Sequence, residues 1–351
     1  MTANTKNTLS FAPMNLNDSI NFITKLNTKR VWNALKVYAS FHLSSFLKKP
    51  VQWGKPFNVS IEPTTECNLG CPECPSGLKS FSRPTGKIDV AFFDKFLNET
   101  ADNLLYLYFY FQGEPYLHPK FLEMVQKAKK RKIYTVTSTN AHFLTERKAK
   151  ETVASGLDRI LVSVDGTTQE IYEQYRKNGK LEKVKKGISN LVNAKKEAKS
   201  KTPHIIMQFL VVKPNEHQID EVKELGKQLG VDEVALKTAQ IYDYENGSDL
   251  IPTIEEFSRY KKQDDGTYAI KNKMKNQCWK LWHSNVVTWD GQITPCCFDK
   301  DADYSMGNLN DTSLDEIWSN KKYDKFRSQI LKDRKAIDIC KNCSEGLKVF
   351  S

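Results

Sequence analysis

Cysteines are the residues of this chain whose type and spacing most directly indicate chemistry. Cys67, Cys71 and Cys74 lie within eight residues of one another, so a single loop can bring three thiolates to one metal centre. Thiolates are the ligands of iron–sulfur clusters, and three of them on a four-iron cube leave one iron free to bind another molecule. A zinc site normally requires a fourth Cys or His, and the nearest downstream His is His118. The first group therefore predicts an iron–sulfur cluster.

A second group of cysteines occupies the last quarter of the chain. It consists of Cys278, Cys296, Cys297, Cys340 and Cys343. Disulfides are rare in a reducing cytoplasm, so metal binding is the leading explanation for both groups. The closing C-x2-C pair also suits zinc, and a structural zinc ion can fold a short segment outright. From the residues alone, zinc and an iron–sulfur cluster both remain open for this group.

The composition is that of a soluble globular protein. Of 351 residues, 39% are hydrophobic and 27% are charged, and no stretch approaches the roughly 18 unbroken apolar residues of a membrane span. Residues 1–30 lack the apolar segment and cleavage site of a secretory signal, so we expect a cytoplasmic protein. Much of the formal net charge of +11 lies on Lys-rich helical faces. Because no nucleic-acid-binding motif accompanies this charge, we expect no nucleic-acid partner.

The elements that must position the cysteines alternate between strands and helices. Apolar runs predict strands at residues 57–62, 105–111, 134–138, 159–164, 205–212 and 233–237. Stretches of helical period predict helices at residues 90–100, 120–131, 145–155, 181–199 and 219–229. Six β–α repeats indicate an α/β fold with parallel strands and outer helices, either barrel-like or open. The first cysteine group follows the first strand, where β/α domains place their chemistry.

Segments outside this repeat have their own signals. Residues 1–50 are predicted to be a polar start followed by helix, with apolar side chains at roughly helical spacing at Trp32, Leu35, Tyr38, Leu43, Phe46 and Leu47. We expect this apolar stripe to pack on the domain, and the alternative is a basic amphipathic surface for a membrane or a partner. Residues 246–275 are predicted to be a helical linker rich in Lys and Glu, and residues 276–351 a compact C-terminal domain.

The first cysteine group resembles the hallmark of the radical S-adenosylmethionine (SAM) superfamily, which is C-x3-C-x2-C after the first strand of a partial (β/α)6 TIM-like barrel. The resemblance implies such a barrel over residues 51–245, with a [4Fe–4S] cluster on Cys67, Cys71 and Cys74. The open iron would bind the methionine moiety of SAM. One electron would then cleave SAM to methionine and a 5′-deoxyadenosyl radical, which abstracts hydrogen from a substrate. Glu73 departs from the family pattern, which often has an aromatic residue beside the adenine.

Strand ends carry further motifs of this family. Phe111-Gln-Gly-Glu-Pro115 resembles the family's Gly-Gly-Glu-Pro segment. Thr137-Ser-Thr-Asn140 resembles its Thr-Asn-Gly segment. Alone, such a motif is also what an ordinary turn looks like. The resemblance implies SAM binding by Gln112, Gly113, Glu114, Thr139, Asn140, Ser163 and Arg176. Asp165 and Arg176 are equally compatible with a turn residue and a surface cation.

The second cysteine group resembles the C-terminal SPASM extension of this superfamily, or its shortened twitch form. The stretch from Gly291 to Cys296, then Met306-Gly-Asn-Leu309 and the closing C-x2-C pair carry the resemblance. A full SPASM module has enough cysteines for two clusters, whereas this group has five. The twitch spacing implies one auxiliary [4Fe–4S] cluster on Cys278, Cys296, Cys340 and Cys343, with Cys297 as a spare that could replace Cys296. Complete cysteine ligation would suit electron transfer.

These resemblances imply an oxidoreductase in which a substrate radical passes its extra electron to the auxiliary cluster. The favoured expectation is dehydrogenation of a sugar or cyclitol alcohol, which requires a general base that the sequence does not identify. The runner-up is radical modification of a ribosomally made peptide or protein, although residues 1–50 are short for the peptide-binding domain of such enzymes. A non-catalytic metal-binding module is the alternative from another class. The expected electron donor is a protein such as flavodoxin or ferredoxin.

Overall fold

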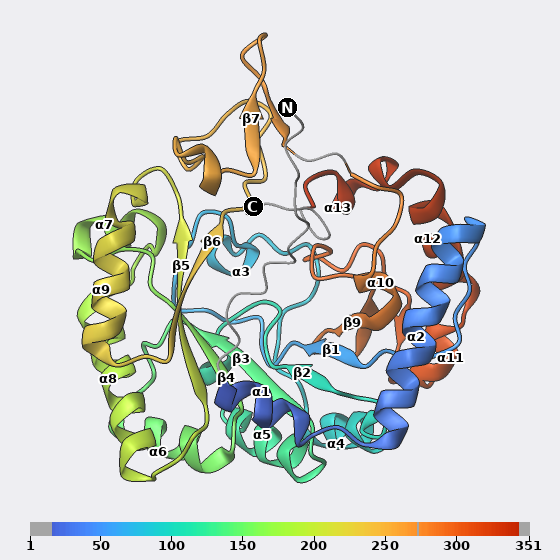
Figure 1. The fold of residues 1–351 in the computed structure, drawn as a ribbon, viewed down its shortest axis with the longest axis horizontal. Helices are drawn as coiled ribbons and strands as arrows, with labels where there is room; N and C mark the ends of the chain where they lie inside the picture. The colour runs from blue at the N-terminus through green and yellow to red at the C-terminus, as the bar shows by residue number, and fades with distance from the viewer. Residues whose placement is uncertain (1–15, 272–273, 344–351) are drawn as a thin grey trace, which may run out of the picture.

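Six parallel strands form the centre of the molecule, as the β–α alternation predicts (Figure 1). The structure is a computed structural model that describes residues 16–271 and 274–343. The strands pair in chain order, each with the next, and are β1 (Asn58–Ile61), β2 (Tyr106–Tyr108), β3 (Tyr134–Thr139), β4 (Arg159–Ser163), β5 (His204–Val211) and β6 (Glu233–Thr238). Parallel pairing in this order places the carboxyl ends of all six strands on one rim of the sheet.

Helices cover the outer side of the curved sheet (Figure 1). They are α4 (Val90–Thr100), α5 (Phe121–Lys130), α6 (Glu146–Ser155), α7 (Gln169–Tyr175), α8 (Leu181–Glu197) and α9 (Ile219–Leu229). Their starts follow ordinary capping chemistry: the Asp89 side chain accepts from the Phe92 N–H, and the Thr145 side chain accepts from the Lys148 N–H. Alternate side chains of the strands, such as Val59 and Leu107, are fully buried, which fixes the sheet against the helices.

The C-terminal part of the chain extends the same sheet. Strand β9 (Ser284–Val287) pairs in parallel with β1, β10 (Gln292–Thr294) pairs antiparallel with β9, and β11 (Gly307–Asn308) follows β10. The sheet therefore has β6 and β11 at its two edges and stays open. This is the predicted α/β fold with a partial (β/α)6 barrel, and its first strand is covered by the small C-terminal domain. That domain also contains α10 (Lys280–His283), α11 (Leu314–Trp318), α12 (Lys321–Asp333) and α13 (Asp338–Lys341).

The prediction of a helical linker at residues 246–275 is wrong. Within the described part of this segment, the regular elements are a 3-10 turn and an antiparallel hairpin of β7 (Tyr260–Lys262) and β8 (Tyr268–Ile270), which projects from the domain (Figure 1). Gly266 has φ of 88° in the hairpin turn, where the Gln263 N–H donates to the Thr267 carbonyl at 2.8 Å. A glycine at positive φ favours this turn over a continuous helix, and the Lys and Glu content of the segment reflects only solvent exposure.

The N-terminal segment is helical where it is described, but its predicted packing face is wrong. It forms α1 (Leu16–Ile23) and α2 (Thr28–Leu47), whereas residues 1–15 lie outside the described residues. Helix α2 attaches to the domain through a largely polar face, because the Arg30 guanidinium donates to the carbonyls of Ala101 and Arg131. Of the predicted stripe, Leu43 is half-buried and the rest is exposed, namely Trp32, Leu35, Tyr38, Phe46 and Leu47. No helix in the described ranges combines the length and apolar character needed to cross a bilayer.

Candidate active site

The first cysteine group lies in the loop between β1 and the short helix α3 (Pro75–Leu78). Its three thiols share a cavity of about 150 Å³ with residues from the ends of β2, β3 and β4. The predicted cofactor residues in this cavity are Gly113, Glu114, Thr139, Asn140, Ser163 and Arg176. Parallel strands deliver these residues to one rim because each motif begins where a strand ends. The remaining candidate, Gln112, does not line the cavity, although its Oε1 lies 3.8 Å from the Cys74 Sγ.

Gly113 allows the loop after β2 to pack directly on the cysteine loop. It has φ of 72°, and a Cβ there would lie 2.2 Å from the Thr64 carbonyl oxygen. Its N–H donates to the Ser76 Oγ at 2.8 Å. Any side chain at this position would push the two loops apart, so the requirement for glycine is steric as well as conformational.

Glu114 connects the loop after β2 to the end of β3. Its carboxylate accepts from the Thr139 hydroxyl at 2.7 Å and from the Asn140 N–H at 2.8 Å. The side chain is fully buried, and this burial raises the pKa of Glu114 to about 7, against the lowering effect of the hydrogen bonds. Because both carboxylate oxygens have partners within the protein, we assign Glu114 a positioning role.

Arg176 places a buried positive charge beside the cysteines. Its Nη1 lies 3.6 Å from the Cys71 Sγ, and its Nε donates to the Asp165 carboxylate at 2.5 Å. Burial lowers the pKa of Arg176, but Asp165 and Cys71 outweigh this and hold the pKa well above the ordinary value. Asp165 in turn accepts from the Leu210 N–H of β5 at 2.7 Å. The pair is therefore a fixed part of the site rather than a turn residue and a surface cation.

The environment of the thiols fits an anionic iron–sulfur cluster. Burial raises the pKa of Cys67 to about 11, so positive neighbours or a bound metal centre must favour its thiolate. The Leu69 N–H lies 3.5 Å from the Cys67 Sγ, and the Asn140 Nδ2 lies 4.0 Å from it. His118, the nearest candidate fourth ligand, instead contacts the Ile88 carbonyl oxygen at 2.9 Å.

The second cysteine group encloses a smaller cavity in the C-terminal domain. The cavity has a volume of about 20 Å³, and Cys278, Cys296, Cys340 and Cys343 all line it. Cys297 is not among its lining residues. The Arg334 Nη2 donates to the Cys343 Sγ at 3.2 Å, and the other walls are apolar. The cavity therefore groups Cys296, rather than Cys297, with Cys278, Cys340 and Cys343.

A much larger cavity is lined by segments that neighbour cysteines of both groups in the sequence. Its volume is about 640 Å³. One side is formed by Pro75 and Leu78, directly after Cys74, and another by Phe298 and Lys300, directly after Cys297. The neighbours of Cys340 close it, together with the segment 240–245 that follows β6.

Lys300 lines this cavity, and no sequence pattern singles it out as a functional residue. Its Nζ lies 4.5 Å from the centre of the Tyr242 ring. Burial lowers the pKa of Lys300, whereas Cys74, Cys297 and Glu73 raise it by their charges. Among the ion pairs found between described residues, none includes Lys300.

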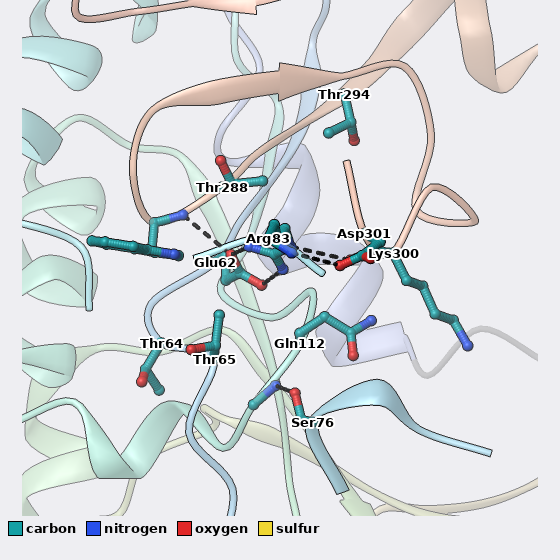
Figure 2. A network of polar contacts seen from close by, with 12 residues as sticks. Glu62, Thr64, Thr65, Ser76, Arg83, Gln112, Thr288, Thr294, Lys300 and Asp301 are labelled. Atoms are coloured by element: carbon teal, nitrogen blue, oxygen red, sulfur yellow. Dashed lines mark hydrogen bonds and ion pairs between the residues drawn. The ribbon is translucent and has the colours of Figure 1, made fainter. Parts of the chain in front are cut away.

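A buried ion pair fixes the C-terminal domain to the segment after the cysteine loop (Figure 2). Arg83, in the segment that follows the cysteine loop and α3, donates from Nη1 and Nη2 to the Glu62 carboxylate at 2.8 and 2.6 Å. The Arg83 Nε also donates to the Lys300 carbonyl at 3.3 Å, and the Ser82 N–H donates to Asp301 at 2.9 Å. These contacts join the end of β1, the segment after the cysteine loop and the turn that carries Lys300. Sequence reasoning missed this network, because its members have no motif spacing.

Comparisons with known proteins agree with this geometry. A radical SAM superfamily model matches residues 61–229, and a model of the SPASM iron–sulfur cluster-binding domain matches residues 278–344. The tungsten-containing aldehyde ferredoxin oxidoreductase cofactor-modifying protein of Pyrococcus furiosus is 30% identical over 299 residues, which cover 76% of this chain and 82% of that protein. The PqqA peptide cyclase of Gluconobacter oxydans is 25% identical over 281 residues, covering 75% of this chain and 76% of the cyclase.

Among solved structures, BtrN in complex with AdoMet and 2-DOIA shares the fold, with a TM-score of 0.52 at 20% identity over 84% of this chain and 95% of BtrN. The family models and the relative from Pyrococcus furiosus identify the chain beyond its fold. The protein belongs to the radical SAM superfamily, with a C-terminal SPASM domain, and is an enzyme whose cofactors are SAM and [4Fe–4S] clusters.

Proposed function

We propose that this protein cleaves SAM reductively at the first cysteine group and oxidises a small polar substrate bound in the larger cavity. When bound, the clusters would supply the electron that cleaves SAM to methionine and a 5′-deoxyadenosyl radical, and an acceptor for the electron that the substrate loses. The observation that carries the proposal is the 640 Å³ cavity, whose walls come from the segments next to Cys74, Cys297 and Cys340.

The side chains around the first group hold and orient the reactants. Cys67, Cys71 and Cys74 would bind three irons, and Arg176 would stabilise the negative charge of that assembly from 3.6 Å. Asn140 and Ser163 face the same cavity and offer hydrogen bonds to the carboxylate or ribose of SAM. The fully buried Glu114 keeps the loop after β2 in register with β3, so these contacts are arranged before SAM binds.

The second group suits electron transfer. Cys278, Cys296, Cys340 and Cys343 would bind all four irons of one auxiliary cluster, so no open iron would remain for a ligand. Arg334, at 3.2 Å from Cys343, would raise the reduction potential by favouring the more negative, reduced state. An acceptor beside the substrate cavity is what a two-electron oxidation requires after hydrogen abstraction.

The cavity walls favour a polar substrate. The carboxylates of Asp301 and Asp338 have protein partners, since Asp301 accepts from Ser82 and Asp338 pairs with Lys341 at 2.7 Å. Lys300, whose Nζ lies 4.5 Å from the Tyr242 ring centre on the cavity wall, is the cation that we propose contacts a substrate hydroxyl, carboxylate or phosphate. A sugar or cyclitol alcohol is the favoured substrate, with Lys300 orienting the alcohol oxygen.

Peptide modification is the second candidate, and the relative named as a PqqA peptide cyclase supports it. The described residues before β1 form α1 and α2, and the site that we propose for a peptide is the open 640 Å³ cavity. The net charge of +11 would attract an acidic electron-donor protein such as flavodoxin or ferredoxin.

Anaerobic assays of reconstituted protein test this proposal. With SAM and dithionite, the wild type should form 5′-deoxyadenosine, and a substrate of the favoured class should increase its rate and be oxidised by two electrons. Replacing Cys67, Cys71 and Cys74 together by Ala should abolish 5′-deoxyadenosine. Replacing Cys340 and Cys343 by Ala should retain it but stop substrate oxidation. Oxidation at the wild-type rate by this second variant would exclude the auxiliary cluster as the electron acceptor.

A further inference from the structure

The N-terminal helices carry most of the exposed large apolar side chains in the described part of the chain. Of fifteen such residues, eleven lie between positions 16 and 53. They are Leu16, Ile20, Ile23, Leu26, Val31, Trp32, Leu35, Tyr38, Phe46, Leu47 and Trp53. Single exposed apolar residues are normal on a protein surface, but a concentration of this kind indicates an interaction surface.

Helix α2 turns its polar face toward the protein and its apolar face toward solvent. At 100° per residue, Val31, Leu35, Tyr38 and Phe46 fall on one stripe with Trp32 at its edge; we call this the apolar stripe of α2. Trp32 is 64% exposed and Phe46 82% exposed. The opposite face is buried and contains mostly polar side chains, namely Arg30, Asn33, Val37, Ser40, Phe41 and Ser44. Helices on the surface of globular proteins normally bury the apolar face instead.

Specific hydrogen bonds fix this orientation. Besides the bonds of Arg30 to the domain, the Asn33 side chain donates to the Lys55 carbonyl at 2.9 Å and accepts from the Lys55 N–H at 2.9 Å. Ser44 donates to the Val51 carbonyl at 3.0 Å and accepts from the Val51 N–H at 2.8 Å. Turning α2 to bury its apolar stripe would leave these polar groups without partners, which is costly. The fold therefore holds the apolar stripe outward.

The segment around the apolar stripe is basic, and this charge indicates the kind of partner that the stripe binds. Between residues 19 and 61 there are seven Lys and Arg residues and no Asp or Glu. Lys25, Lys29 and Lys55 pair with carboxylates elsewhere in the fold, and Arg30 is buried, which leaves three lysines for a partner. Lys48 and Lys49 are exposed at the end of α2, and Lys36 is half-buried at the side of the apolar stripe. A stripe with Trp, Tyr, Phe and Leu that is bordered by lysines matches helices that lie in the plane of an anionic bilayer surface. Trp and Tyr also favour the bilayer interface because their rings are apolar and carry a polar group.

We propose that the apolar stripe of α2 and its flanking lysines bind this protein to the surface of an anionic lipid bilayer. The stripe enters the boundary between headgroups and acyl chains, and Lys36, Lys48 and Lys49 contact lipid phosphates. The helix lies on the bilayer rather than crossing it. This inference is independent of the proposed function, because it concerns neither cysteine group nor any cavity.

Sedimentation with vesicles tests the proposal on the full, cluster-loaded chain. The wild type should sediment with vesicles of phosphatidylcholine mixed with phosphatidylglycerol, and at least about tenfold less with phosphatidylcholine alone. Trp32→Gln with Phe46→Gln should lower the affinity about tenfold or more, since both side chains leave the acyl region. Lys48→Gln with Lys49→Gln should lower affinity for the anionic vesicles about fivefold per lysine and reduce its salt dependence.

Matched variants outside the region serve as controls. Ile254 is 39% exposed, and Lys261 and Lys262 are exposed on β7. The change Ile254→Gln, and the double change Lys261→Gln with Lys262→Gln, should each leave vesicle binding unchanged. Iron content and SAM cleavage should stay at wild-type levels in every variant. Equal vesicle binding by wild type and the Trp32 and Phe46 variant would overturn the proposal. A second result would also overturn it, namely a protein that does not bind vesicles but forms a dimer that the Trp32 and Phe46 changes dissociate. In that case a second copy of the chain would cover the apolar stripe.

Discussion

The ion pair of Glu62 and Arg83 allows a quantitative prediction about the junction between the two domains. Both side chains are buried, with 0% of Glu62 and 5% of Arg83 exposed, and two parallel hydrogen bonds join them (Figure 2). Replacing Arg83 by Met removes the cation and both bonds. Of its hydrogen bonds to described residues, the Glu62 carboxylate then keeps the one from the Trp289 N–H, at 3.2 Å. Removing one member of a buried pair costs about 3–5 kcal/mol, and we expect Arg83→Met to lose about this much stability at pH 7.

The loss should depend on pH with a defined sign. Burial already raises the pKa of Glu62 above its ordinary value, even though Arg83 lowers it. Without Arg83 the folded-state pKa rises further above the unfolded value of about 4.3, so the folded state binds the proton more tightly. The penalty is therefore smallest below the unfolded pKa and grows as pH rises through the folded pKa. Arg83→Met should be closest to wild type in acid and furthest from it at neutral pH.

Urea unfolding followed by circular dichroism, on anaerobic cluster-loaded protein at pH 5 and pH 7, measures both effects. The double variant Glu62→Gln with Arg83→Met removes the unpaired charge and should recover most of the loss, to within about 1–2 kcal/mol of wild type. Because Arg83 also donates to the Lys300 carbonyl, the single variant should in addition slow substrate oxidation more than SAM cleavage. A loss below about 1 kcal/mol, or one that is equal at both pH values, would refute the reasoning.

Three further outcomes follow from the site. Cys296→Ser should remove about half of the bound iron and Cys297→Ser almost none, since only Cys296 lines the cavity of the second group; the reverse result in an iron assay would exchange their roles. Lys300→Met should keep 5′-deoxyadenosine formation but lower substrate oxidation about tenfold or more by loss of a charged contact, whereas Lys341→Met, which removes a cation paired with Asp338, should have little effect. Gly113→Ala should weaken SAM binding and lower cluster occupancy in absorbance titrations, because its Cβ would lie 2.2 Å from the Thr64 carbonyl oxygen; wild-type SAM affinity would contradict the close packing.

The sequence by itself determined the features that depend on neighbouring residues. The spacing of Cys67, Cys71 and Cys74 places three thiols in one loop, and the alternation of apolar runs and amphipathic stretches gives the six parallel strands and their outer helices. Gly113 could be singled out because its motif directly follows a strand. The four cysteines of the second group also come together as their family spacing predicts. These signals are local, or repeat with the period of the element that carries them.

Only the tertiary structure decided the contacts between residues that lie far apart in the chain. Glu62 accepts from the Trp289 N–H, and Arg83 donates to the Lys300 carbonyl, although no spacing in the sequence predicts either contact. Composition predicted a helix at residues 246–275, but a turn at Gly266 and strand pairing produced a hairpin. The apolar stripe of α2 was visible in the sequence, whereas its orientation depended on carbonyl groups more than seventy residues away, such as that of Ala101. Periodicity shows that a helix has two faces, but the partners available in the fold decide which face is buried.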